Sequence, residues 1–442
     1  MGGAQQAGAL SPGIRFGYAT GSVATGAFGT VPGLMLLPFL TDSLGVAAIW
    51  AGLIVFAPKA WDVVLNPIAG RISDRSTDPR GPRRPFLLRG GLALAVCFAL
   101  LFVGPDLGST LADALWVLLA FLACATAYAF FQVPYVSMPA EITSSYDERT
   151  RLMAWRVAVL AFTILLAGAS APAIRDAVGG RDGYRVMGVA MAVIIAIGVL
   201  GSYYGTRRAP FTALDAGAGS VRDQLRVVAG ARDFRLLLTT FVLQALATGS
   251  MLAGVDYLAG DVLERDGAST ILFVCFVGPA LVLTPLWARF GTRFGKRTGY
   301  LVSSVILAGG AALSAVALLD SAAALVFVAV ALVGVGYAGA QVFPMAMLPD
   351  AAAADAKRTG ENRAGVFTGV WTAGETLGLA AGPALYALVL ALGDYRSSTD
   401  GDAVQPDSAL TAIVLGFSLL PALLTLISLF WLSRYRLTEA DL

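Results

Sequence analysis

The sequence predicts an all-α integral membrane protein with twelve transmembrane helices, arranged as two pseudo-symmetric six-helix bundles. Apolar runs of about 20 residues, the length that spans a bilayer, recur along the whole chain. Hydrophobic residues make up 57% of the chain and charged residues 14%, whereas soluble domains carry about a quarter charged residues. Polar features of the first half return in the second half. These observations together predict two parallel repeats of six membrane helices each.

The first six spans follow a polar N-terminal stretch and are separated by short charged or polar segments. The 50 glycines of the chain, many of them in these spans, allow the close helix packing that membrane bundles need. The predicted spans are 16–40, 47–70, 86–104, 113–138, 152–174 and 184–205.

The last six spans repeat the pattern after the longest polar stretch of the chain. Two prolines five residues apart, Pro134 and Pro139, close the fourth span, and Pro344 and Pro349 close the tenth in the same way. The predicted spans are 235–258, 269–288, 299–319, 322–348, 364–392 and 409–432. We therefore expect an N-terminal bundle at 1–205, a cytoplasmic linker at 206–233, and a C-terminal bundle with a short tail at 234–442.

Arginine and lysine predict the orientation of the chain. If both termini lie in the cytoplasm, 24 of the 31 basic residues fall in cytoplasmic segments and five fall outside. This bias follows the positive-inside rule at every loop. Lys59 and Arg156 are the two basic residues left within the membrane. We expect a multi-pass protein of the plasma membrane, monomeric in the bilayer.

The composition excludes several classes of function. A net charge of +2 does not suggest nucleic-acid binding, and the absence of histidine removes the usual general base and metal ligand. The three cysteines, Cys97, Cys124 and Cys275, lie in apolar stretches without CxxC spacing. We therefore expect no enzyme activity and no cofactor.

Asp62 is the most informative single residue. A carboxylate deep in a membrane helix is costly unless it is paired or hydrated, so it indicates function by default. Lys59 and Asn66 lie three residues before it and four residues after it, which places all three on one helix face. A structural pair between Asp62 and Lys59 remains the alternative.

Five motifs stand out along the chain: Trp61-Asp62 with Asn66-Pro67, Arg83-Arg84-Pro85, Gln132-Val-Pro134-Tyr135, Glu148-Arg149 with Arg156, and Met347-Leu348-Pro349-Asp350. Together they resemble the glycoside–pentoside–hexuronide:cation symporters of the major facilitator superfamily. The run from Trp287 to Thr298 is also similar to the sodium-dependent lysophospholipid symporters. The resemblance covers the whole chain.

The resemblance implies a coupling site for H⁺ or Na⁺ at Asp62, Asn66, Lys59 and Glu375. The family's second acid, four residues after the first, is here Asn66. Where the family has a hydroxyl in span four, this chain has Ala129. Where the family has a lysine in span eleven, this chain has Thr376, beside Glu375. A hard cation needs several oxygen ligands. Proton coupling is therefore favoured over Na⁺, although a Na⁺ site at Asp62 and Asn66 remains an alternative.

The resemblance also implies a substrate site, but without the family's sugar-binding carboxylates. Gly26 and Gln132 stand at those positions. Arg156 is retained, and it could hold an anionic substrate group or pair with an acid. The candidate substrate-binding residues are Tyr128, Gln132, Arg156, Trp371 and Thr376.

Charged residues at the cytoplasmic ends of the spans are expected to form a gate. Ion pairs of modest strength suit a gate, because they must break and re-form. The candidates are Asp74, Arg75, Arg83, Arg84, Glu141, Arg149, Asp350 and Arg363.

The leading hypothesis is a cation-coupled symporter of a small organic solute, either a sugar or glycoside or a lysophospholipid-like amphiphile. The lost sugar carboxylates favour the amphiphile, and the family's usual substrates favour the sugar. A gradient-driven exporter of lipids or drugs, and a non-transporting receptor with the same fold, remain alternatives. The surviving buried charges argue against the receptor.

Overall fold

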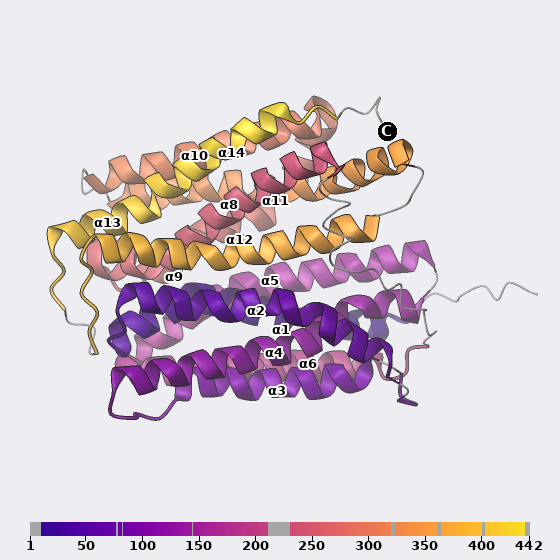
Figure 1. Cartoon of the computed structure of the whole chain (residues 1–442), viewed down its shortest axis with the longest axis horizontal. Helices are drawn as coiled ribbons and strands as arrows, with labels where there is room; N and C mark the ends of the chain where they lie inside the picture. Colours follow the sequence, from indigo (N-terminus) through magenta and orange to yellow (C-terminus); the bar gives the residue numbers. More distant parts are fainter. Residues whose placement is uncertain are drawn as a thin grey trace, which may run out of the picture. The chain divides into compact units, whose positions relative to one another are not determined.

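The computed structural model describes residues 10–76, 78–81, 83–143, 145–210, 230–319, 323–359, 364–399 and 403–437. Its elements are all helical (Figure 1). The first half contains α1 (Pro12–Pro38), the π-helical turn η1 (Phe39–Ser43), α2 (Ala48–Asp74), α3 (Arg84–Val103), α4 (Thr110–Ile142), α5 (Tyr146–Val178) and α6 (Gly180–Thr206). The second half contains α8 (Arg232–Tyr257), the π-helical turn η2 (Leu258–Val262), α9 (Ala268–Phe294), α10 (Lys296–Leu319), α11 (Ala323–Thr359), α12 (Ala364–Leu392), α13 (Asp407–Phe417) and α14 (Leu419–Arg434).

The prediction of twelve membrane spans is confirmed. Within the described residues, twelve helical segments are long and apolar enough to cross a membrane. The last of them differs in detail from the single helix expected at 409–432, because it breaks into α13 and α14 at Ser418. Pro421 follows three residues later, and a proline lacks the N–H that would continue the hydrogen-bond ladder across this point.

The contacts divide the chain into two compact units. One unit comprises Met1–Pro32 and Ala57–Gly217, and the other comprises Gly33–Phe56 and Ala218–Leu442. The end of α1, the turn after it and the start of α2 pack with the helices of the second half.

Local sequence signals explain where several helices begin. Ser109 caps α4 by accepting a hydrogen bond from the Ala112 N–H, and Ser145 caps α5 by accepting one from the Glu148 N–H. Such side-chain oxygens satisfy backbone donors that the first turn leaves free. α2 carries prolines at both ends of its polar stripe, Pro58 and Pro67. Each proline removes one backbone hydrogen bond from the helix.

A pair of glycines lets α1 and α6 come into backbone contact. A Cβ added to Gly17 would lie 2.5 Å from the Gly205 Cα. This distance is shorter than the contacts that real Cβ atoms make. Close backbone approach at small residues is the main way in which membrane helices gain packing energy. This contact helps to hold α1 within the first unit, where it carries part of the candidate site.

Candidate transport site

Asp62 lies near the middle of the 27-residue helix α2 and is only 3% exposed. Its Oδ1 is buried and makes no hydrogen bond within the described part of the chain. A buried carboxylate without a fixed partner is costly. The side chain therefore has the properties of a group that takes up a proton or a cation in the course of its work.

The Lys59 ammonium lies over an aromatic ring. Its Nζ is 4.0 Å from the centroid of the Phe28 ring, and the rings of Phe121 and Tyr128 lie 5.7 Å and 5.9 Å away. These rings come from α1 and α4, and the Phe28 and Tyr128 centroids are 4.5 Å apart. The ammonium is thus held by cation–π attraction, and it forms no ion pair within 4 Å of an Asp62 oxygen.

Gln132 bonds to α1 within the first unit. Thr25 Oγ1 donates to Gln132 Oε1 at 2.7 Å. The bond leaves the amide nitrogen of Gln132 as a donor for another group. Tyr128, the other α4 residue predicted to bind substrate, instead packs at a tilt against Phe28 and belongs to the aromatic surroundings of Lys59.

Arg156 of α5 faces a tyrosine pair that joins α1 to α4. Its guanidinium carbon is 5.5 Å from the centroid of the Tyr135 ring, and its Nε is buried without a hydrogen bond. Tyr135 stacks on Tyr18 at 4.8 Å, and Ser22 Oγ lies 3.0 Å from the Tyr135 hydroxyl. The remaining nitrogens of Arg156 are not engaged by a carboxylate in the described residues, which leaves this cation able to bind an anionic group.

Two residues, Ala129 and Asn66, stand where the sodium site implied by the resemblance would need a hydroxyl and a second carboxylate. Ala129 is fully buried in a small apolar cluster with Leu65 and Ala69, where α4 packs on α2. Asn66 is half-buried and makes no hydrogen bond to a described residue. Asp62 therefore stands beside an apolar helix contact and one neutral amide, and the described residues hold no group of three or more acids or cysteines suited to a metal ion.

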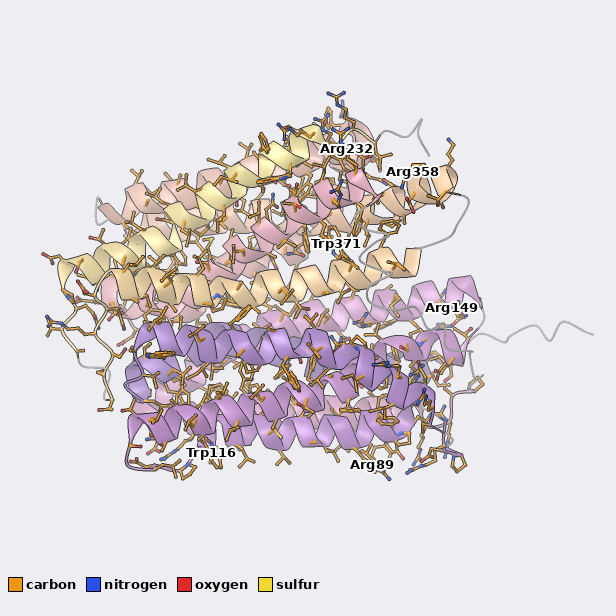
Figure 2. All side chains as sticks on the ribbon, in the orientation of Figure 1. Arg89, Trp116, Arg149, Arg232, Arg358 and Trp371 are labelled. Atoms are coloured by element: carbon orange, nitrogen blue, oxygen red, sulfur yellow. The ribbon has the colours of Figure 1, made fainter. Side chains whose placement is uncertain are left out.

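The candidates of the second unit are described separately. Trp371 is 1% exposed, and its ring stacks on Phe241 with centroids 4.4 Å apart. Figure 2 shows Trp371 among the helices of this unit. Its surroundings are those of a packing residue. Glu375 and Thr376, on the same helix α12, are half-buried, and Glu375 interacts electrostatically with Tyr337 of α11.

Arg83 is the centre of the predicted gate in the first unit. Its guanidinium lies 2.5 Å from Asp74 Oδ1 and 2.6 Å from Glu141 Oε1, and it also donates to Ser73 Oγ at 2.6 Å. One cation therefore ties the end of α2 to the end of α4. Arg83 is 11% exposed and Glu141 is 6% exposed, so salt screens this pair less than it screens a surface ion pair.

The other gate candidates have different surroundings. Arg84 is buried and donates to the carbonyls of Arg80 and Ala209. Arg149, near the N-terminal end of α5 (Figure 2), donates to the Thr143 carbonyl at 2.9 Å. Arg75 is exposed and has no ion pair with a described residue.

In the second unit, Asp350 pairs with Lys296 at 2.6 Å. This pair ties α11 to the start of α10, much as Arg83 ties α4 to α2. Arg363 lies outside the described residues.

Two groups of polar contacts were not predicted as sites. Glu148 forms a two-point ion pair with Arg15, with distances of 2.9 Å and 3.1 Å. Asp42 and Asp261 meet at Tyr395. The signal for the second group was present in the sequence, because each aspartate follows the first span of its repeat. Their convergence depends on long-range packing, which no local pattern shows.

Twelve spans in two repeated sets, with a carboxylate, an ammonium and a guanidinium within the spans of the first set, define a transporter of the major facilitator class and not an enzyme. The particular family is also clear. The chain belongs to the MFS/sugar transport protein family, whose model matches residues 17–439.

Two relatives illustrate the range of the family. The chain is 25% identical over 448 residues to the inner membrane symporter YicJ of Escherichia coli (strain K12), covering 96% of this chain and 92% of the relative. It is 26% identical over 367 residues to the sodium-dependent lysophosphatidylcholine symporter 1 of Mus musculus, covering 75% of this chain and 68% of the relative.

Solved structures share the fold at low sequence identity. A bacterial homologue of the human lysosomal transporter Spinster gives a TM-score of 0.66 at 13% identity, covering 96% of this chain and 95% of that one. A bacterial homologue of the human drug peptide transporters PepT1 and PepT2 gives 0.68 at 13% identity, covering 95% and 96%. At this level of identity they support the fold alone.

Proposed function

We propose that this protein is a proton-coupled symporter that carries a small organic solute by alternating access. Asp62 is the proton-binding group, and Lys59, Tyr128, Gln132 and Arg156 contribute to solute binding and coupling. Glu375 and Thr376 are the corresponding candidates of the second unit. The observation that carries the proposal is the buried, unbonded carboxylate oxygen of Asp62 in the middle of a membrane span.

A proton fits this site better than Na⁺. Hard cations take about six oxygen ligands at short distance, and the described neighbours supply one carboxylate and one amide, beside the apolar Ala129 cluster. A proton needs only one basic oxygen in a poorly hydrated place. The ammonium of Lys59 lies over the Phe28 ring, so it leaves the Asp62 carboxylate oxygen available to a proton.

Two solute classes are supported by the relatives. The family description names sugar transport, and the mouse relative is named for lysophosphatidylcholine. The aromatic surroundings of Lys59 and the guanidinium of Arg156, which no described carboxylate engages, suit a solute with an apolar part and an anionic group. We therefore rank the amphiphile above a neutral sugar.

The charged contacts at the helix ends support a cytoplasmic gate. Arg83, with Asp74 and Glu141, and Lys296, with Asp350, are pairs that can break as the helix ends separate. The arginine distribution supports both termini in the cytoplasm and insertion in the plasma membrane. A monomer is the simplest assembly consistent with a substrate path within one chain.

The test is uptake into proteoliposomes that contain purified protein and a trapped pH-sensitive dye. Labelled glycosides and a fluorescent lysophosphatidylcholine are supplied under an inward proton gradient or an inward Na⁺ gradient. We expect uptake of one class to be driven by the proton gradient and to acidify the lumen. Asp62→Asn, which keeps the size of the side chain, should abolish uphill uptake.

Matched results decide each part of the proposal. The control variant is Asp182→Asn, at an exposed ion pair of α6. Normal accumulation by Asp62→Asn would remove the coupling role. If only the Na⁺ gradient drives uptake, the coupling ion is Na⁺ and not a proton. If the solute only equilibrates across the membrane under both gradients, symport is excluded.

A further inference from the structure

The turn after α1 is bonded to the segment that follows α12, and both lie in the second unit. The Ser398 N–H donates to the Thr41 carbonyl at 2.9 Å, and Ser397 Oγ donates to the Val46 carbonyl at 2.9 Å. The arginine distribution assigns this end of the helices to the outside. We define the outer seam as residues 41–46 together with residues 395–399.

Two aspartates meet one tyrosine hydroxyl at this seam. The Tyr395 hydroxyl oxygen lies 2.9 Å from Asp42 Oδ1 and 3.3 Å from Asp261 Oδ2. Asp42 is the fourth residue of η1, and Asp261 is the fourth residue of η2. These π-helical turns follow the first helix of each repeat. The repeat has therefore placed equivalent carboxylates on either side of a single hydroxyl.

The number of hydrogens at this bridge has a chemical consequence. A tyrosine hydroxyl has one hydrogen and can donate it to only one carboxylate. The second carboxylate can bond to the tyrosine oxygen only if it carries a proton and donates it. With both carboxylates ionised, one bond is lost and two negative charges face each other in a partly buried place. One bound proton completes the bridge.

The surroundings strengthen this dependence on one proton. Burial raises the pKa of Tyr395, as does the charge of Asp42, so the phenol keeps its hydrogen. In the described residues neither aspartate forms an ion pair with an arginine or lysine; Arg265 lies over the Phe327 ring, and Arg396 is exposed. The other titratable groups facing the bridge are Asp256, which accepts from Ser269 Oγ, and the phenols Tyr257 and Tyr386.

We propose that Asp42, Tyr395 and Asp261 form a proton-dependent latch, which holds the outer seam closed when one carboxyl is protonated and releases it when both are ionised. Alternating access requires such a seam to open in each cycle. External alkalinity therefore favours the outward-open state. The latch is separate from Asp62, and its test needs neither a solute nor a coupled gradient.

The experiment measures access to a reporter thiol within the seam. Val46 is 4% exposed, so Val46→Cys is protected when the seam is closed. Purified protein is treated briefly with N-ethylmaleimide between about pH 6 and pH 8.5, a range in which thiol ionisation itself changes. Labelling of the peptide that contains the reporter is followed by mass spectrometry. The same reporter with Asp261→Asn is measured in parallel, so that the intrinsic ionisation of the thiol cancels in the ratio.

Asparagine at 261 can donate to Tyr395 without a titrating proton, so this variant should stay closed at every pH. We divide the labelling rate of the reporter protein with Asp261 by the labelling rate of the same protein with Asp261→Asn. We expect this ratio to rise about tenfold from acid to alkaline pH, which is the change produced by one lost charge-assisted hydrogen bond. Tyr395→Phe removes both bonds and should give rapid labelling at acid pH. A ratio that stays constant with pH would overturn the latch.

A second variant protects the test against a folding failure. Asp42→Asn should behave as Asp261→Asn does, because either amide can complete the bridge. Thermal melting and size-exclusion profiles establish which variants are folded before labelling. If both folded asparagine variants keep the pH dependence of the parent, another group controls the seam and the latch is excluded.

Discussion

At the scale of single residues, the arrangement of Lys59 governs how Asp62 can work. The ammonium sits over Phe28 and not against the carboxylate, although the two residues are one helical turn apart. Cation–π attraction at a poorly hydrated ring contributes about 0.5–2 kcal/mol, enough to compete with a salt bridge whose desolvation is costly. We therefore propose that Phe28 is a positioning residue for the proposed coupling site.

Replacing Phe28 with leucine tests this role. Without the ring, Lys59 is free to approach Asp62, and a carboxylate next to an ammonium holds a proton less readily. Proton-driven uptake by Phe28→Leu should reach half its maximum at a more acidic pH than in the parent protein. Phe28→Tyr keeps the aromatic face and should leave the pH profile unchanged. Overlapping profiles for the leucine variant and the parent would contradict the positioning role.

At the scale of helices, α1 depends on close contact with α6. Gly17 packs against the backbone of Gly205, whereas Gly29, on the same helix, has open space around the position of a Cβ. Gly17 is therefore tightly packed and Gly29 is not, although both lie on α1, so the two positions form a matched pair for substitution. α1 also carries Thr25 and Phe28 to the candidate site, so its placement bears on function.

Alanine substitutions at these two glycines should have opposite effects. Gly17→Ala forces a methyl group into backbone, which costs about 1–3 kcal/mol when neighbours cannot move. Gly29→Ala should be neutral or stabilising by up to about 1 kcal/mol, because alanine favours helix. Thermal unfolding of the purified variants measures both changes. Equal melting temperatures for the two variants would show that the helix contact is looser than described.

At the scale of the whole molecule, ion pairs at the helix ends fasten segments that are distant in sequence. Glu148 accepts hydrogen bonds from Arg15 and from the Leu10 N–H, so that the start of α5 holds the start of α1. Burial acts to raise the pKa of Glu148. The hydrogen bonds from Arg15 and from the Leu10 N–H, together with the charges of Arg15 and Arg151, outweigh burial and lower this pKa.

The stability of the molecule should therefore depend on the ionised form of Glu148. A lowered pKa means that the contribution is present above the unfolded-state pKa and is lost as pH falls through the folded-state value. Glu148→Gln should melt at a lower temperature than the parent protein at neutral pH, and this gap should close as the pH falls below the ordinary pKa range of a glutamate. Asp182→Asn, at the exposed pair with Arg185, should show almost no gap. A gap that persists in acid would assign the effect to packing.

The fold was largely predictable from local sequence. Lipid-exposed helices must satisfy their own backbone hydrogen bonds, so runs of about 20 apolar residues mark spans directly. The break at Ser418 was missed because serine and proline are tolerated inside membrane helices, and only neighbouring helices decide whether the chain bends there. The grouping of residues 33–56 with the second unit depends on packing between segments that are distant in the chain, which no local sequence pattern shows.

The sequence by itself determined the membrane class, the twelve spans, the repeat and the presence of the charged residues Lys59, Asp62 and Arg156 within spans. Each of these follows from the cost of placing polar groups in lipid, which a single chain segment reveals. Tertiary structure alone decided which partners those charges have. It placed Lys59 over Phe28, left Asp62 Oδ1 without a hydrogen bond, and brought Asp42 and Asp261 to Tyr395. Such contacts depend on the register of packed helices, and residues up to 353 positions apart contribute to one bridge.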